Sequence, residues 1–133
     1  MISISIIFAL LASSVMSDVS VQYTEREFES KIANNKLAIV AFYAPWCHYS
    51  KALLPEFEHA AYVTNSILRM NVGMIKVDCY EKDATICARN KVHGYPTIKV
   101  FKNGVPFKVY PGPRTSEALV YFIMDIIHGI IKD

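Results

Sequence analysis

The sequence predicts an α/β domain with a mixed central sheet and helices on both of its faces. Three observations lead to this fold class. Segments with helical and strand periodicity alternate along the chain. One of the strand segments, residues 37–43, is apolar throughout, as expected of a strand that helices cover on both faces. Further along, Lys102-Asn103-Gly104 separates two β-rich runs and predicts an antiparallel hairpin, because Asn-Gly tolerates positive φ.

The chain begins with an uncharged apolar run that is typical of a secretory signal peptide. The run is shorter than the roughly 20 residues that cross a bilayer, and Val15-Met16-Ser17 offers small residues for cleavage. We expect a signal peptide over residues 1–17 and one domain over 18–133, located in the endoplasmic reticulum lumen or secreted. A buried N-terminal strand or an uncleaved anchor are the alternatives, because no Lys or Arg precedes the run.

The first helix is predicted from residue 24 to residue 34, after a short N-terminal strand. Thr24 and Glu27 have the spacing of a capping box. Phe28 and Ile32 follow at helical spacing, and two asparagines then end the run. The apolar strand over 37–43 comes next and is expected at the centre of the sheet.

A second helix is predicted from just after Pro45 to about Asn65. Pro55 interrupts its hydrogen bonding and is expected to kink it, because proline has no amide to bond the Lys51 carbonyl. The apolar side of this helix is expected to hold Leu53, Leu54, Phe57 and Ala61.

The second half of the chain predicts a strand over 72–77, a short helix from Asp83 to Asn90, and hairpin strands over 97–101 and 105–110. The crossovers make part of the sheet parallel, and the hairpin adds an antiparallel edge. A last helix within 118–131 is expected to pack on the sheet rather than to contact a membrane, because charged and polar residues interrupt it. Its helix-period apolar positions are Leu119, Phe122, Ile123, Ile126, Ile127 and Ile130.

Composition and charge exclude several classes of function. The chain has 133 residues, with 14 Lys+Arg against 12 Asp+Glu and a formal net charge of +2. These charges alternate in sign, so we expect neither nucleic-acid binding nor a membrane span in the mature chain. No metal site is expected, because Cys47 and His48 are adjacent ligands without the third and fourth that metals require, and no cofactor is implied.

Four motifs stand in order along the chain: Phe42-Tyr43-Ala44-Pro45-Trp46-Cys47, Gly94-Tyr95-Pro96-Thr97, Phe101-Lys102-Asn103-Gly104 and Tyr110-Pro111-Gly112-Pro113-Arg114-Thr115. Together they resemble a thioredoxin domain of the protein disulfide isomerase family. The resemblance covers about residues 18–128 and implies a thioredoxin fold with a cis peptide bond before Pro96. It also implies that the backbone of Tyr95 pairs with an extended client segment.

Cys47 is the predicted nucleophile. It follows a strand and begins a helix, where unpaired amides and the helix dipole stabilise a thiolate and lower the thiol pKa. As an imidazolium, His48 would add to this stabilisation. The redox members of the family have a second cysteine at the position of Ser50, and a hydroxyl cannot resolve a mixed disulfide, although it can donate a hydrogen bond to the thiolate.

A second departure from the redox members agrees with the first. Ala41 stands where they carry a buried acid that serves the second thiol. The pattern is most similar to the monothiol chaperone of the endoplasmic reticulum, which holds client cysteines through a Cys-x-x-Ser site. We therefore expect mixed disulfides with client proteins and at best partial isomerase activity, without dithiol turnover. The alternative is a non-catalytic peptide-binding module in which Cys47 is incidental.

Three further assignments complete the predicted site. Cys79 and Cys87 match a pair that forms a structural disulfide in some isomerase domains, with two free thiols as the alternative. Trp46 and Tyr49 are expected to supply apolar contacts for the client, although Trp46 would serve equally well in packing against the sheet. Arg114 matches an arginine that acts on the second thiol of redox members, and a structural role is left for it here.

Overall fold

The structure is a computed structural model that describes residues 23–80 and 84–132. Helices and strands alternate within these residues in the predicted order. The expected signal peptide, the strand expected before the first helix, and Asp83 lie outside the described residues. The elements are α2 (Glu25–Ala33), β1 (Leu37–Tyr43), α3 (His48–Tyr62), the π-helical η2 (Val63–Ile67), β2 (Gly73–Asp78), α4 (Ala84–Arg89), β3 (Thr97–Lys102), β4 (Val105–Val109) and α5 (Ser116–Ile127).

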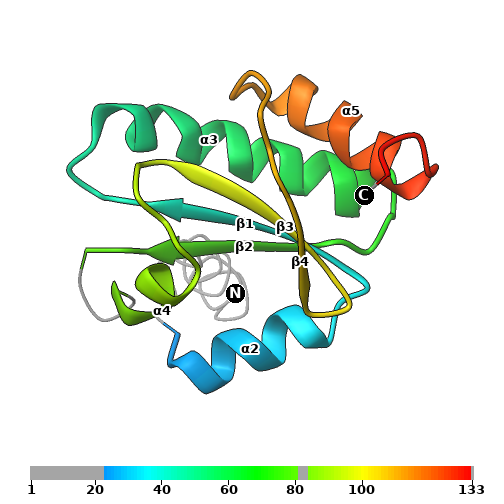
Figure 1. The fold of residues 1–133 in the computed structure, drawn as a ribbon. Helices are drawn as coiled ribbons and strands as arrows, with labels where there is room; N and C mark the ends of the chain where they lie inside the picture. The colour runs from blue at the N-terminus through cyan, green and yellow to red at the C-terminus, as the bar shows by residue number, and fades with distance from the viewer. Residues whose placement is uncertain (1–22, 81–83, 133) are drawn as a thin grey trace, which may run out of the picture.

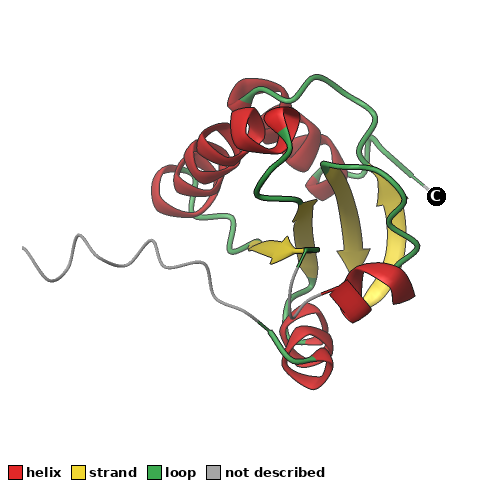
Figure 2. Ribbon diagram, turned by 90° about the vertical axis from the view of Figure 1, so that its left-hand side faces the viewer, coloured by secondary structure: helices red, strands yellow, loops and turns green. Residues whose placement is uncertain are grey.

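The strands form one mixed sheet in the order β2-β1-β3-β4. β1 pairs parallel with β2 and antiparallel with β3, and β3 and β4 form the antiparallel hairpin at the edge. Asn103 and Gly104 take φ values of 50° and 80° in the hairpin turn, as the Asn-Gly signal predicts. Helices α3 and α5 cover one face of the sheet, and α2 and α4 cover the other (Figures 1 and 2). This arrangement confirms the predicted fold class and the thioredoxin fold.

Strand β1 belongs to two hydrophobic cores, one on each face. All seven of its residues are buried. Because side chains alternate along a strand, Leu37, Ile39 and Ala41 join the core under α3 and α5, whereas Ala38, Val40 and Phe42 join the core under α2 and α4. The lack of polar alternation in its sequence follows from this burial on both faces. The packing on both faces also holds the end of β1 in place, where the site begins.

The first helix begins as the capping-box pattern predicts. The Glu27 backbone N–H donates to the Thr24 hydroxyl at 3.2 Å, and the Thr24 backbone N–H donates to the Glu27 carboxylate at 3.4 Å. Phe28 and Ile32 are buried on its inner side. There the Phe28 ring lies 6.1 Å from that of Phe42 on β1, which ties α2 to the central strand.

The helix after the site differs in detail from the prediction. Pro55 lies inside α3, which continues through it to Tyr62, and the chain then widens into the π-helical η2. Its buried positions are Ser50, Leu53, Phe57 and Ala60, whereas Leu54 and Ala61 are half-buried. Beyond η2, the Asn65 side chain bonds both backbone groups of Val72 at 2.8 Å and holds this end of the helix to β2.

The last helix ends earlier than its apolar pattern predicts. α5 buries Leu119, Ile123 and Ile126 against the sheet, which confirms core packing. It stops at Ile127, and Gly129 takes a φ of 72°, so the chain turns away from the helical path. The prediction that Ile130 continues the buried face is therefore wrong, and its side chain is 69% exposed.

Candidate functional site

Cys47 lies between the end of the central strand β1 and the start of helix α3. β1 ends at Tyr43, the Cys47 backbone N–H donates to the Ala44 carbonyl at 3.0 Å, and α3 begins at His48 with Cys47 as its N-cap. The thiol is free and half-buried. No side chain caps this helix, so the Cys47 sulfur occupies the position from which an oxygen would ordinarily accept the first-turn amides.

The surroundings of the thiol favour its ionised form. The Ser50 backbone N–H, which is directed at the thiolate, is the largest influence and lowers the pKa of Cys47, while desolvation raises it. The Tyr49 N–H, the Ser50 hydroxyl and the positive charge of Arg114 lower the pKa further, and the net change is downward. This agrees with the expectation for a cysteine at a helix N-terminus.

Ser50 is built into the fold rather than exposed beside the thiol. Its side chain is fully buried, and its hydroxyl oxygen accepts a hydrogen bond from the Ala44 backbone N–H at 3.2 Å. The hydroxyl proton remains available to donate to the Cys47 sulfur. Ser50 therefore joins the end of β1 to the first turn of α3 and supports the thiolate.

The loop before β3 lies against the thiol. The bond between Tyr95 and Pro96 is cis, as the resemblance implies. The protonated Cys47 thiol donates to the Tyr95 carbonyl oxygen at 3.7 Å. This carbonyl belongs to the residue whose backbone is expected to pair with a client, so a client chain paired there would run past the sulfur.

Three aromatic side chains form a cluster on one side of the thiol. The ring centroid of Trp46 lies 6.1 Å from that of Tyr95 and 6.4 Å from that of Tyr80, both edge to face. Trp46 is 59% exposed and Tyr80 is 64% exposed. Trp46 is thus not a packing residue of the sheet, and Tyr80 is a member of the cluster that the sequence did not predict.

The tyrosine that the sequence predicts to contact clients lies on the first turn of α3. Tyr49 is exposed, with the ring of His48 at 5.7 Å and the Arg114 guanidinium carbon at 5.8 Å from its ring centroid. The sequence leaves a structural role for Arg114. The structure adds that its positive charge lowers the pKa of Cys47.

Cys79 and Cys87 form a disulfide between the residue after β2 and helix α4, as the resemblance implies. Both are buried in the core under α2 and α4. The bond fixes the backbone next to Tyr80, so it holds one edge of the aromatic cluster, and it leaves Cys47 as the unpaired thiol.

Within residues 23–80 and 84–132, no three His, Cys, Asp or Glu side chains lie close enough together to hold a metal ion. None of the helices in the same ranges has the length and hydropathy that crossing a bilayer requires.

With this geometry in view, comparison with known proteins defines the family. Residues 19–125 match the thioredoxin family. The chain belongs to the thioredoxin family. This thioredoxin-family domain is 41% identical over 121 residues to the probable protein disulfide-isomerase A6 of Medicago sativa, covering 90% of this chain and 32% of that protein. It is 40% identical over 112 residues to protein disulfide-isomerase A3 of Gallus gallus, covering 84% of this chain and 21% of that protein.

Solved structures point the same way. Human ERp44 in a zinc-bound form superposes on the domain with a TM-score of 0.72 and 33% identity, over 78% of this chain and 30% of that one. Its crystal form II gives a TM-score of 0.74 with 31% identity, over 83% and 30%. The thioredoxin-family domain thus spans about a third or less of the length of these relatives.

The lowered pKa of Cys47 predicts a pH profile of alkylation. The iodoacetamide rate should reach half its maximum at a pH below that of free cysteine, about 8.5, because the folded protein favours the thiolate. Ser50→Ala should move this midpoint upward while leaving it below the free value, since the backbone amides remain. The same chain unfolded in guanidinium is the control and should show the ordinary midpoint. A folded midpoint equal to the unfolded one would contradict the prediction.

Proposed function

We propose that this domain is a secretory-pathway protein of the disulfide isomerase type with one active-site thiol. Cys47 forms mixed disulfides with client proteins for folding, partial isomerisation or quality control. On this proposal residues 1–17 are a signal peptide, residues 18–133 are the working domain, and the location is the endoplasmic reticulum lumen or the exterior. The observation that carries it is the placement of an activated thiol at Cys47 beside a serine at position 50.

The proposed reaction begins with attack on a client disulfide. The Cys47 thiolate attacks one sulfur, the bond between the two client sulfurs breaks, and the other client sulfur leaves as a thiolate that takes a proton from water. The released thiolate can attack again within the client, which rearranges its disulfides. With Ser50 in place of a second thiol, no intramolecular step of the domain expels the client, so the mixed disulfide persists.

The groups around Cys47 divide the remaining work in this proposal. Tyr95 and Pro96 receive the client backbone, and Trp46 and Tyr49 contact its side chains. Their support is geometric, because the Tyr95 carbonyl lies 3.7 Å from the sulfur and both aromatic rings are exposed. Ser50 and His48 are assigned to the thiolate, and the buried Cys79–Cys87 disulfide is assigned a structural role.

The decisive experiment compares the wild type with Cys47→Ala. Tagged protein is expressed in a secretory compartment, thiols are blocked with N-ethylmaleimide, and the lysate is resolved without reductant. We expect a series of high-molecular-weight adducts in the wild type. A reductant should cleave these adducts, and they should be absent in Cys47→Ala.

The alternative function predicts a different gel. A non-covalent peptide-binding module would run as one monomer band in both lanes, and client peptides would bind equally well to the wild type and to Cys47→Ala. The observation that favours this alternative is the aromatic cluster, in which Trp46 and Tyr80 are exposed beside the half-buried Tyr95. Identical lanes would overturn the covalent function and leave the peptide-binding module.

A further inference from the structure

A groove lies beside the active-site thiol, between the loop of Pro96 and the segment that joins β4 to α5. Its volume is about 390 Å³, with residues 96–98 along one wall and residues 109–114 along the other. The Tyr110 backbone N–H donates to the Ile98 carbonyl at 2.8 Å and joins the two walls. One end of the groove is close to the sulfur, because its lining residue Pro96 directly follows Tyr95, whose carbonyl oxygen lies 3.7 Å from the Cys47 sulfur.

Arg114 lines this groove and forms no salt bridge with an acidic side chain within residues 23–80 and 84–132. The salt bridges among the described residues join Lys76 to Glu58 and Arg89 to Glu25, and neither involves Arg114. Its contacts are the Tyr49 ring at 5.8 Å and the electrostatic influence on the thiolate. A guanidinium carries five donors in a planar fork that matches the two oxygens of a carboxylate. An exposed arginine in a groove beside a nucleophile therefore offers a site for an anionic group.

We propose that Arg114 binds a carboxylate of the client, so that Cys47 forms its most stable mixed disulfides with client cysteines that have Asp or Glu close by in sequence. This inference rests on the proposed function, because it names the client class of the same site. The client segment follows the Tyr95 backbone and continues into the groove, where its acidic side chain meets the guanidinium.

The charge balance of the reaction supports this choice of client. Before reaction, the Cys47 thiolate is an anion whose ionised form the positive charge of Arg114 favours. When the sulfur of Cys47 bonds to the client sulfur, its negative charge departs with the leaving thiolate. Arg114 is then left facing a neutral disulfide under a covering client chain, where water screens it less. A client carboxylate replaces the lost anion and forms charge-assisted hydrogen bonds that exist only in the adduct.

The test is a competition between two peptides for one protein thiol. Wild-type protein equilibrates with two peptides of equal length, each present as thiol and disulfide. One peptide has Glu and the other has Gln at a position two residues from its single cysteine. The competition is run with two such peptide pairs, one with the variable residue before the cysteine and one with it after the cysteine. Intact-mass spectrometry gives the ratio of the two adducts. A neighbouring Glu also changes the reactivity of the peptide's own thiol. The quantity of interest is therefore a quotient, the ratio of Glu-peptide adduct to Gln-peptide adduct in the wild type divided by the same ratio in Arg114→Gln.

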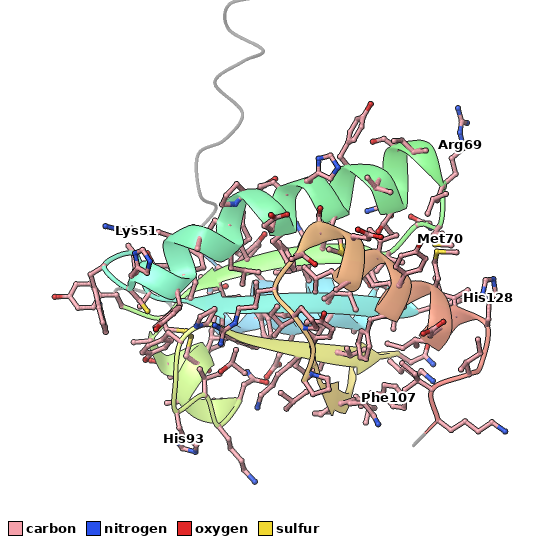
Figure 3. All side chains as sticks on the ribbon, turned by 90° about the horizontal axis from the view of Figure 1, so that it is seen from above. Lys51, Arg69, Met70, His93, Phe107 and His128 are labelled. Carbon is pink, nitrogen blue, oxygen red and sulfur yellow. A yellow bond between two sulfur atoms is a disulfide. The ribbon has the colours of Figure 1, made fainter. Side chains whose placement is uncertain are left out.

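We expect that quotient to be about three to ten, the range of a solvent-accessible, charge-assisted ion pair. The adduct ratio in Arg114→Lys should lie between those of the wild type and Arg114→Gln, because a lysine keeps the positive charge but loses the planar, two-pronged donor geometry of the guanidinium. Both peptides compete for the same sulfur, so any change in the reactivity of Cys47 itself cancels. Lys51→Gln is the matched control: Lys51 points outward from the first turn of α3 (Figure 3), and its loss should leave the wild-type ratio unchanged.

Three outcomes would overturn the inference, and they separate it from the proposed function. Equal ratios in the wild type and Arg114→Gln, with both adducts present, reject the carboxylate site and leave the monothiol function standing. An equal fall in Lys51→Gln attributes the preference to diffuse positive charge and also rejects the site. No adduct with any peptide rejects the proposed function together with this inference.

Discussion

Replacing Ser50 with cysteine should convert a thiol that retains its clients into one that releases them. The new sulfur would lie on the first turn of α3, where the Ser50 hydroxyl now accepts from the Ala44 N–H and hydrogen-bonds to Cys47. It could attack the mixed disulfide from within the protein, and intramolecular attack replaces a slow bimolecular step. We expect reductase turnover on insulin to rise about a hundredfold or more, and the adducts on a non-reducing gel to fade.

Ser50→Ala provides the matched control for this gain. It removes the hydroxyl without adding a thiol, so the adducts should persist and insulin turnover should stay at the wild-type level. Ala41 stands where redox relatives are expected to carry the acid that serves a second thiol, so turnover of Ser50→Cys should remain below that of a complete isomerase. Undiminished adducts in Ser50→Cys, with no rise in turnover, would show that something other than a missing thiol holds the client.

The second large effect concerns the buried disulfide. Replacing both Cys79 and Cys87 with alanine should lower the free energy of unfolding by about 2–3 kcal/mol, because the unfolded chain is freed from a closed loop of about nine residues. The bond also ties α4 to the end of β2 inside a core. Urea unfolding followed by the fluorescence of Trp46 measures the change, since Trp46 is the only tryptophan of the chain.

In that experiment, a reductant distinguishes the contribution of the disulfide bond to stability from that of the two cysteine side chains. Dithiothreitol should lower the urea midpoint of the wild type toward that of the double variant, and it should leave the double variant unchanged. A wild-type midpoint that does not respond to dithiothreitol throughout equilibrium unfolding would show that the bond does not stabilise the domain.

The features that sequence predicted well are those that local pattern determines. The apolar run 37–43 indicates a strand buried on both faces, and all seven of its residues are buried. The spacing of Thr24 and Glu27 indicates a helix that begins just after Thr24, and α2 begins there. The position of Cys47 after a strand and before a helix likewise placed it at an N-cap. In each case, neighbours in sequence supply the decisive hydrogen bonds or burial.

The features that sequence missed depend on contacts between distant segments. Tyr80 reaches Trp46 across more than thirty residues of chain, and Arg114 reaches the thiolate from the loop before α5. An exposed aromatic next to Cys79 was the available signal for Tyr80, but nothing local says where its ring points. Ile130 fits helical periodicity and is nevertheless exposed, because Gly129 ends the helical path first.

The attachment of the thiol to the central strand has a mechanical consequence. Cys47 lies four residues beyond the end of β1 at Tyr43, and β1 is hydrogen-bonded to β2 on one side and to β3 on the other. Ladder hydrogen bonds run across the strands, so a tug on a tethered client along the strand axis loads both ladders in shear at once instead of peeling them one bond at a time. On the proposed function, a client bound to Cys47 is therefore anchored to the central strand, which is held by two neighbouring strands, and not to a strand at the edge of the sheet.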